Sequence, residues 1–174
     1  MKPIDRLKSF LEKQAQLMGE INPNPDWKYG GFEELILDCG IEMSFASLPE
    51  DIDRGLPKSC YYNCFQLLKE DFNLTYCEGY ALDPELPLPL IHAWLVDKDG
   101  QVTDPTWDDC DAVYLGIPFD TKWFVELLRS RNREDCLAVF ESNYLEGFSL
   151  LKEGLPNEAI ATKMTDIRKR TSGK

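Results

Sequence analysis

The feature that most constrains the fold is a hairpin pattern between residues 90 and 106. An almost continuous apolar run over 90–96 is followed by Asp97-Lys98-Asp99-Gly100, residues that favour a tight turn, and the chain then returns over 101–106. The segment 74–82 ahead of the hairpin also has strand character, and 112–115 is a fourth candidate. We therefore expect an antiparallel meander of four strands in the middle of the chain.

Apolar residues recur at helical spacing on both sides of these strands. Gly40 ends one such segment, Asp120 or Thr121 can cap another, and Gly154 and Pro156 separate the last two. Helices are predicted over residues 4–18, 32–39, 120–129, 136–151 and 157–168. The predicted order is therefore helices, then one helix followed by an antiparallel sheet, then helices again. This order is typical of an α+β fold.

The chain length of 174 residues fits one domain. We divide that single domain, 1–174, into an amino-terminal helix and loop over 1–31, a core over 32–119 and carboxy-terminal helices over 120–174. Hydrophobic residues make up 43% of the chain, enough for a buried core, so disorder is excluded for most of it. No apolar run approaches the ~20 residues that a membrane-spanning helix needs.

The charge distribution narrows the possible partners. The formal net charge is −12, and the stretch from Lys163 onward holds five basic residues and one acidic residue, so the rest of the chain is more acidic still. Such a body repels phosphate backbones, and we expect no nucleic-acid partner and no membrane partner. The oligomeric state is left open by the sequence.

The cysteines and the single histidine bear on cofactors and location. The six cysteines form no C-x-x-C pair, and one histidine does not complete a usual zinc site. The chain also lacks the glycine-rich loops that bind nucleotides, so we predict no metal and no other cofactor. The start, Met1 to Arg6, has no apolar stretch behind it, so we interpret it as mature sequence. We expect a cytoplasmic protein with free thiols.

A potential nucleophile lies ahead of the strands. Ser59 is a plausible N-cap, and apolar residues at 61, 64, 65 and 68 predict a helix whose first turn contains Cys60. A helix amino terminus and an adjacent imidazole both stabilise a thiolate, which is the reactive form of cysteine. The imidazole must belong to His92, because the chain has no other histidine. Cys64 is the alternative, but it falls one turn inside the helix.

The hairpin register decides whether His92 has an acidic partner. If Asp97 pairs with Gln101, then Trp94 opposes Asp104, and His92 and Asp104 are diagonal neighbours on one face of the sheet. A hydrogen bond is then within reach, and it would fix the tautomer of the imidazole. A slip of one residue would place the two side chains on opposite faces.

Three short motifs follow the cysteine helix in a specific order. They are Glu78-Gly79-Tyr80, His92-Ala93-Trp94 and Asp104-Pro105-Thr106. With Cys60 ahead of them, these motifs resemble the transglutaminase-like branch of the papain-like cysteine superfamily over residues 57–107. The chain also resembles small uncharacterised bacterial and phage proteins with this core. The family often carries glycine two residues before the cysteine, where this chain has Lys58.

The resemblance implies a fold and a chemistry. The fold would be a cysteine-bearing helix packed on an antiparallel sheet, with further helices at both ends. The activity would be acyl transfer through a thioester, with Cys60 as nucleophile, His92 as base and Asp104 as its orienting partner, acting on a peptide, protein or carboxamide. Hydrolysis and transamidation remain equal alternatives. Candidate substrate-binding residues are Tyr61, Tyr80, Trp94 and Trp107.

A non-enzymatic alternative stays open at the level of sequence. The same core occurs without activity, so the chain is alternatively an inactive transglutaminase-like scaffold that binds a protein partner through its terminal helices. Burial of Cys60 beneath the loop 83–89, with no cleft, would favour this alternative. Each motif residue also has an ordinary structural explanation, since cysteines pack in cores and Asp before Pro commonly forms turns.

Overall fold

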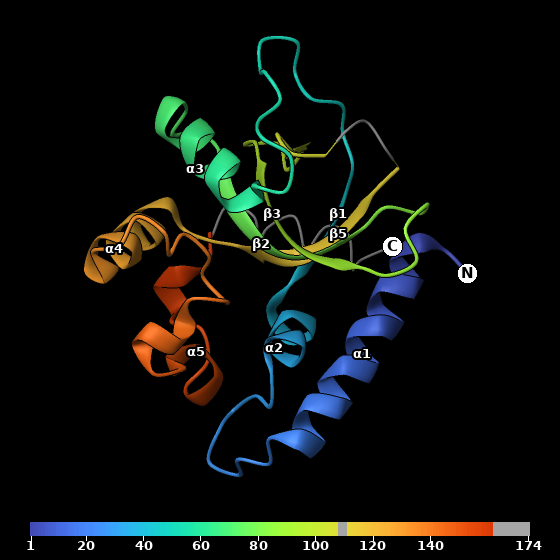
Figure 1. The fold of residues 1–174 in the computed structure, drawn as a ribbon, viewed down its shortest axis with the longest axis vertical. Coiled ribbons are helices and arrows are strands. Elements are labelled where there is room, and N and C mark those ends of the chain that lie inside the picture. The colour runs from blue at the N-terminus through green and yellow to red at the C-terminus, as the bar shows by residue number, and fades with distance from the viewer. Residues whose placement is uncertain (108–110, 162–174) are drawn as a thin grey trace.

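The computed structural model describes residues 1–107 and 111–161. One central sheet is flanked by helices, with α4 and α5 close together (Figure 1), and α1 to α5 all contribute side chains to the same buried cluster. The helices are α1 (Pro3–Ile21), α2 (Phe32–Cys39), α3 (Cys60–Glu70), α4 (Thr121–Arg131) and α5 (Ser149–Lys152), with short 3-10 turns η1 (Asn143–Glu146) and η2 (Asn157–Ala159). Among the described residues, no helix combines the length and the apolar character needed to cross a bilayer. The α+β fold expected from the sequence is confirmed.

The sheet has five strands in the order β1-β5-β2-β3-β4, and all neighbouring strands are antiparallel. The strands are β1 (Ile41–Ser44), β2 (Thr75–Leu82), β3 (Leu90–Val96), β4 (Val102–Thr103) and β5 (Val113–Pro118). The predicted meander is therefore wrong in two respects. It lacked β1, and it placed the last strand beside β4, whereas β5 crosses back to pair with the central strand β2. Four residues are too few for the periodicity of β1 to be recognisable.

The two faces of the sheet bury separate clusters of side chains. On β3, Ala93 and Leu95 belong to a core shared with α3, whereas Trp94 and Val96 belong to a second cluster with Tyr114 of β5. The strands are thus apolar on both faces, as expected when other elements cover the sheet on both sides. The helix α3 packs against β3 and β2, which brings its first residue close to His92.

Several predicted boundaries are confirmed by local contacts. Gly40 follows the last residue of α2, and its N–H bonds to the carbonyl of Ile36. Asp120 caps α4, with its carboxylate 3.0 Å from the amide of Trp123. Asn132 ends the same helix in a left-handed conformation with φ 49°.

One predicted strand is shorter than expected, and one predicted helix is described only in part. The strand predicted over 101–106 pairs only at Val102 and Thr103, because Pro105 has no N–H and a carboxylate oxygen of Asp104 takes the amides of Thr106 and Trp107. Of the helix predicted over 157–168, the described residues 157–161 contain only η2, and residues 162–168 lie outside the described part of the chain.

The helix predicted over 136–151 is largely irregular. Several backbone groups of residues 136–140 bond to two buried side chains rather than to one another in a helix. Arg131 donates to the carbonyls of Cys136, Ala138 and Val139. Glu78 accepts from the amides of Val139 and Phe140. Only η1 and α5 are regular in this stretch, which means that tertiary contacts overrode helical periodicity here.

Candidate active site

Cys60 is the first residue of α3, as predicted, and its side chain is partly exposed. Ser59 occupies the N-cap position, but its hydroxyl bonds to the carbonyl of Pro57 at 3.3 Å rather than capping the helix. The N–H groups of the first turn therefore receive no side-chain cap from Ser59. Cys64 is one turn further along and fully buried, and burial raises the pKa of its thiol well above the ordinary value. Cys60 is thus the better placed of the two cysteines for chemistry.

His92 and Asp104 meet as the hairpin register predicted. The amide of Asp97 bonds to the carbonyl of Gln101, and Leu95 pairs with Thr103, so Trp94 stands opposite Asp104. The Nε2 atom of His92 lies 2.7 Å from Oδ2 of Asp104. Cys60 also lies near the imidazole, close enough to help raise the pKa of His92.

The carboxylate of Asp104 is held at both oxygens. Oδ1 accepts from the amides of Thr106 at 2.9 Å and Trp107 at 3.2 Å, and Oδ2 accepts from the hydroxyl of Tyr114 at 3.1 Å in addition to its contact with His92. Four polar groups thus surround a carboxylate that is 2% exposed. This arrangement keeps Asp104 in one orientation and favours its ionised form.

The electrostatics of the pair follow from burial and hydrogen bonding. Burial alone would lower the pKa of His92, but the hydrogen bond to Asp104 and the nearby Cys60 outweigh it and raise the pKa to about 9. Burial alone would raise the pKa of Asp104, but His92 and the amides of Thr106 and Trp107 lower it. Both shifts favour the charged forms of the two side chains.

A cleft of about 540 Å³ opens over Cys60 and His92. Its walls come from the segment before α3, from the loop 83–90, and from Thr106 and Trp107. The indole of Trp107 stacks on the His92 ring with their centroids 4.5 Å apart. Cys60 and the largely buried His92 therefore line one hollow, and Asp104 is not among its lining residues.

The chain matches no protein-family model, no curated protein and no solved structure. Function must therefore be inferred from the chemistry of the site. Cys60 of α3 and His92 of β3 line one cleft, and Asp104, in the turn after β4, bonds to His92.

The structure brings only one of the four aromatic substrate-binding candidates to the cleft. Trp107 lines it, whereas Trp94 is fully buried and donates from Nε1 to the sulfur of Met43 at 3.3 Å. The hydroxyl of Tyr80 bonds to Glu33 of α2, and Tyr61 lines a separate hollow beside the segment 134–142. Of the four candidates, Trp107 therefore remains as a predicted substrate contact in this cleft.

Two contributors to the site were not predicted from the sequence. Tyr114 reaches Asp104 from β5, and Asn63 of α3 reaches Thr106 beside it. Asn63 is only 5% exposed, so its side chain belongs to the interior rather than to the helix surface. Tyr114 carried no recognisable signal, because its strand was placed at the wrong position in the sheet.

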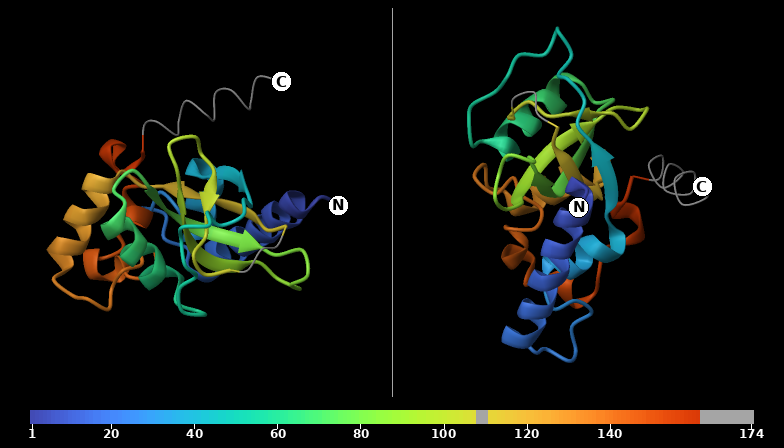
Figure 2. Two further views of the ribbon diagram at one scale, coloured as in Figure 1. Left: turned by 90° about the horizontal axis from the view of Figure 1, so that it is seen from above. Right: turned by 90° about the vertical axis from the view of Figure 1, so that its right-hand side faces the viewer.

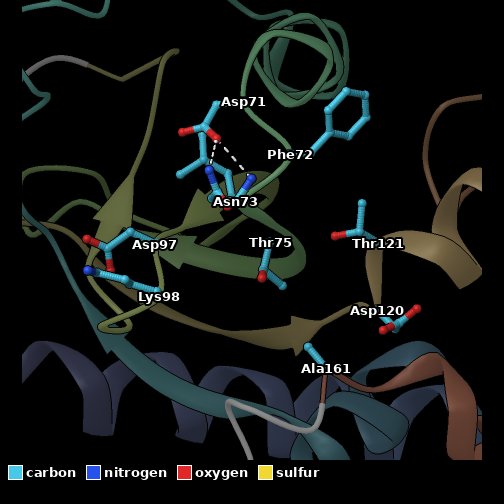
Figure 3. A pocket seen from close by; sticks show the side chains of 10 residues that line it. Asp71, Phe72, Asn73, Thr75, Asp97, Lys98, Asp120, Thr121 and Ala161 are labelled. Atoms are coloured by element: carbon cyan, nitrogen blue, oxygen red, sulfur yellow. Dashed lines mark hydrogen bonds between the residues drawn. The ribbon is translucent and has the colours of Figure 1, made fainter.

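A second hollow of about 700 Å³ lies elsewhere, between the end of α3, the hairpin turn and the start of α4 (Figure 3). Its carboxylates are used locally. Asp71 bonds to Asn73, and Asp97 bonds to the amides of its own turn. No group of three or more potential metal ligands occurs among the described residues. We therefore assign no ligand to this hollow.

Proposed function

We propose that this protein is a cysteine-dependent acyl-transfer enzyme. The observation that carries the proposal is the placement of one imidazole between a carboxylate and a thiol at an accessible cleft. This is the arrangement in which a base is oriented by one partner and activates the other. The motif order shared with the transglutaminase-like branch of the papain-like superfamily supports the same reaction class.

In the proposed reaction, the sulfur of Cys60 attacks the carbonyl carbon of an amide, and His92 holds the proton that leaves the thiol. The tetrahedral intermediate then collapses, the C–N bond breaks, and His92 delivers this proton to the departing amine. The remaining thioester is resolved when water or an amine attacks it, and the thiol of Cys60 is restored. Throughout the reaction, Asp104 accepts a hydrogen bond from the imidazole and stabilises its charged form.

The start of α3 is suited to stabilise the oxyanion of the intermediate. First-turn N–H groups have no partner within their own helix, and Ser59 does not cap them. In the proposed complex the carbonyl oxygen lies against these donors, including the amide of Cys60. Hydrogen bonds to a developing oxyanion are among the largest contributions to acyl-transfer rates.

The alternative, an inactive scaffold that binds a protein, predicted a Cys60 covered by the loop 83–89. Cys60 instead lines the cleft together with Asp83 and Leu86 of that loop. The cleft therefore favours the enzymatic proposal over the scaffold.

The direct test is alkylation of the full-length protein with iodoacetamide at pH 6 to 7, followed by mass spectrometry of each cysteine. We expect Cys60 to react faster than Cys39, which is also partly exposed but whose thiol pKa is raised by burial. His92→Ala should slow Cys60 and leave Cys39 unchanged. A Cys60 that reacts no faster than an ordinary exposed thiol, with or without His92, would overturn the proposal.

A further inference from the structure

Asn63 stands one turn after Cys60 on α3 and joins three segments of the site. Its Nδ2 donates to the carbonyl of Leu56 at 2.8 Å and to the hydroxyl of Thr106 at 2.9 Å. Its Oδ1 accepts from the amide of Leu56 at 3.0 Å. Both donors and one acceptor site of this buried amide are thus in use, so a change of side chain must break at least one of these bonds.

The segment that Asn63 holds is the end of a long loop. Residues 45–59 contain no helix or strand, extend away from the sheet and return to the start of α3 (Figures 1 and 2). Near its end, the amide of Gly55 bonds to the carbonyl of Pro105 at 2.7 Å, and the guanidinium of Arg54 bonds to the carbonyl of Trp107. The loop before the nucleophile is therefore fastened to the turn that follows Asp104.

The packing around Asn63 leaves little freedom. A Cβ atom on Gly55 would lie 2.3 Å from Cγ of Asn63, so the loop backbone rests directly on the amide plane. Thr106, whose hydroxyl receives the Asn63 bond, also donates its amide to Asp104. A continuous chain of contacts thus runs from α3 through Asn63 and Thr106 to Asp104 and on to His92.

We infer that Asn63 is a positioning residue of the reaction. It holds the helix that carries Cys60 and the turn that carries Asp104 at a fixed separation, so that the thiol and the imidazole remain aligned. This inference rests on the proposed function and adds a residue to it. A residue that served stability alone would leave the reactivity of the folded site unchanged, and this difference makes the role testable.

The test uses full-length variants that break the contact from either side. Asn63→Asp removes both donors while keeping the shape, and Thr106→Val removes the hydroxyl while keeping the amide that serves Asp104. Thr106→Ser retains the hydroxyl and should therefore keep the contact with Asn63. Asn73→Ala is the matched control, because Asn73 is exposed and bonds only to Asp71 in the described contacts.

Two readouts are measured from pH 5 to 11, namely the iodoacetamide rate constant of Cys60 and the NMR titration of His92. We expect Asn63→Asp and Thr106→Val to lower the rate constant about two- to tenfold near neutral pH, the factor that one ordinary hydrogen bond represents. We also expect both variants to shift the pH profile of alkylation and the titration of His92. Thr106→Ser should lie closer to the wild type than Thr106→Val in both measurements, and Asn73→Ala should follow the wild type.

Wild-type profiles in folded Asn63→Asp and Thr106→Val would overturn the inference. Thr106→Val breaks one bond of three and preserves volume, so it decides the question even where Asn63→Asp fails to fold. Failure of the proposed function has a different signature, which is a wild-type Cys60 with ordinary reactivity. The titration of His92 still reports on the alignment in that case.

Discussion

The Nε2 atom of His92 lies 2.7 Å from Oδ2 of Asp104, and the two side chains are only 4% and 1% exposed. Removing one partner of such a buried pair destabilises the protein, because the other partner is left charged and unpaired. The pair also faces a partly exposed thiol across a cleft. This relationship sets the acid–base behaviour of the site and leads to the first two predictions.

The titration of His92 should be measurable without ambiguity, because it is the only histidine in the chain. We expect NMR of the imidazole to give a pKa raised from 6.5 to about 9 in the wild type. Asp104→Asn should lower that pKa, since the carboxylate that stabilises the imidazolium is lost. Asp135→Asn, a change at an exposed carboxylate bonded to Arg133, should leave it unchanged. A wild-type pKa near 6.5 would contradict the charge pairing.

The same pKa predicts how stability depends on pH. The folded-state pKa of His92 is raised above the unfolded value of 6.5, so its stabilising contribution is complete below pH 6.5 and is lost as the pH rises through about 9. The loss is on the order of 3 kcal/mol. The free energy of unfolding, measured by urea denaturation, should fall more between pH 6 and pH 9.5 in the wild type than in His92→Gln. Equal falls in the two proteins would argue against the linkage.

Lys58 adopts a backbone conformation that favours glycine. Its φ is 60°, two residues before Cys60, at the position where the resembled family often carries glycine. We expect Lys58→Gly to stabilise the fold by about 0.5–1 kcal/mol, because a left-handed non-glycine residue costs about 1–2 kcal/mol and part of the relief is offset by the greater freedom of unfolded glycine.

The matched control for this change is Lys122→Gly in the first turn of α4, where the lysine is exposed and helical. Glycine there should destabilise the protein by up to about 1 kcal/mol. Thermal denaturation of the two variants should therefore shift in opposite directions. Destabilisation by both changes would refute the strain at Lys58.

Glu78 is a fully buried carboxylate that anchors the segment after α4. It accepts from the hydroxyl of Tyr76 at 3.0 Å and from the amides of Val139 at 2.6 Å and Phe140 at 2.9 Å, yet burial raises its pKa to about 7. Glu78→Gln replaces one acceptor oxygen with an NH₂ group, so at least one buried donor loses its partner. We expect the free energy of unfolding of this variant to be lower than that of the wild type by about 1–3 kcal/mol at pH 8.

Denaturation at pH 8 should separate this variant from Glu126→Gln, which changes an exposed side chain on α4 and should alter stability by less than about 0.5 kcal/mol. Increased proteolytic cleavage within 136–142 is expected in Glu78→Gln, since that segment depends on the carboxylate. Identical stability of the two variants would show that Glu78 does not anchor the segment.

The local parts of the site were predictable because their signals are local. Helix α2 and strand β3 begin and end where the periodicity and the turn residues placed them. The turn at Asp97–Gly100 fixed the register, and the register alone put His92 and Asp104 on one face. The position of Cys60 at the start of α3 followed from Ser59 and the apolar spacing behind it.

The parts that could not be predicted depend on contacts between distant segments. Glu78 reaches amides 61 and 62 residues away, and these contacts replace the regular helix that the periodicity of 136–151 favours. Tyr114 approaches Asp104 only because β5 pairs with β2 rather than with β4. Nothing in the spacing of apolar residues encodes which strand lies beside which.

The amino-acid order thus dictated helix α2, strand β3, the hairpin register and the meeting of His92 with Asp104, since short-range hydrogen bonding and side-chain alternation decide these features. Chain packing alone decided that Cys60 stands at an open cleft, that Trp94 is buried while Trp107 covers the imidazole, and that Asn63 joins the helix to the Asp104 turn. Those outcomes require segments far apart in sequence to compete for the same space, and only the folded chain resolves that competition.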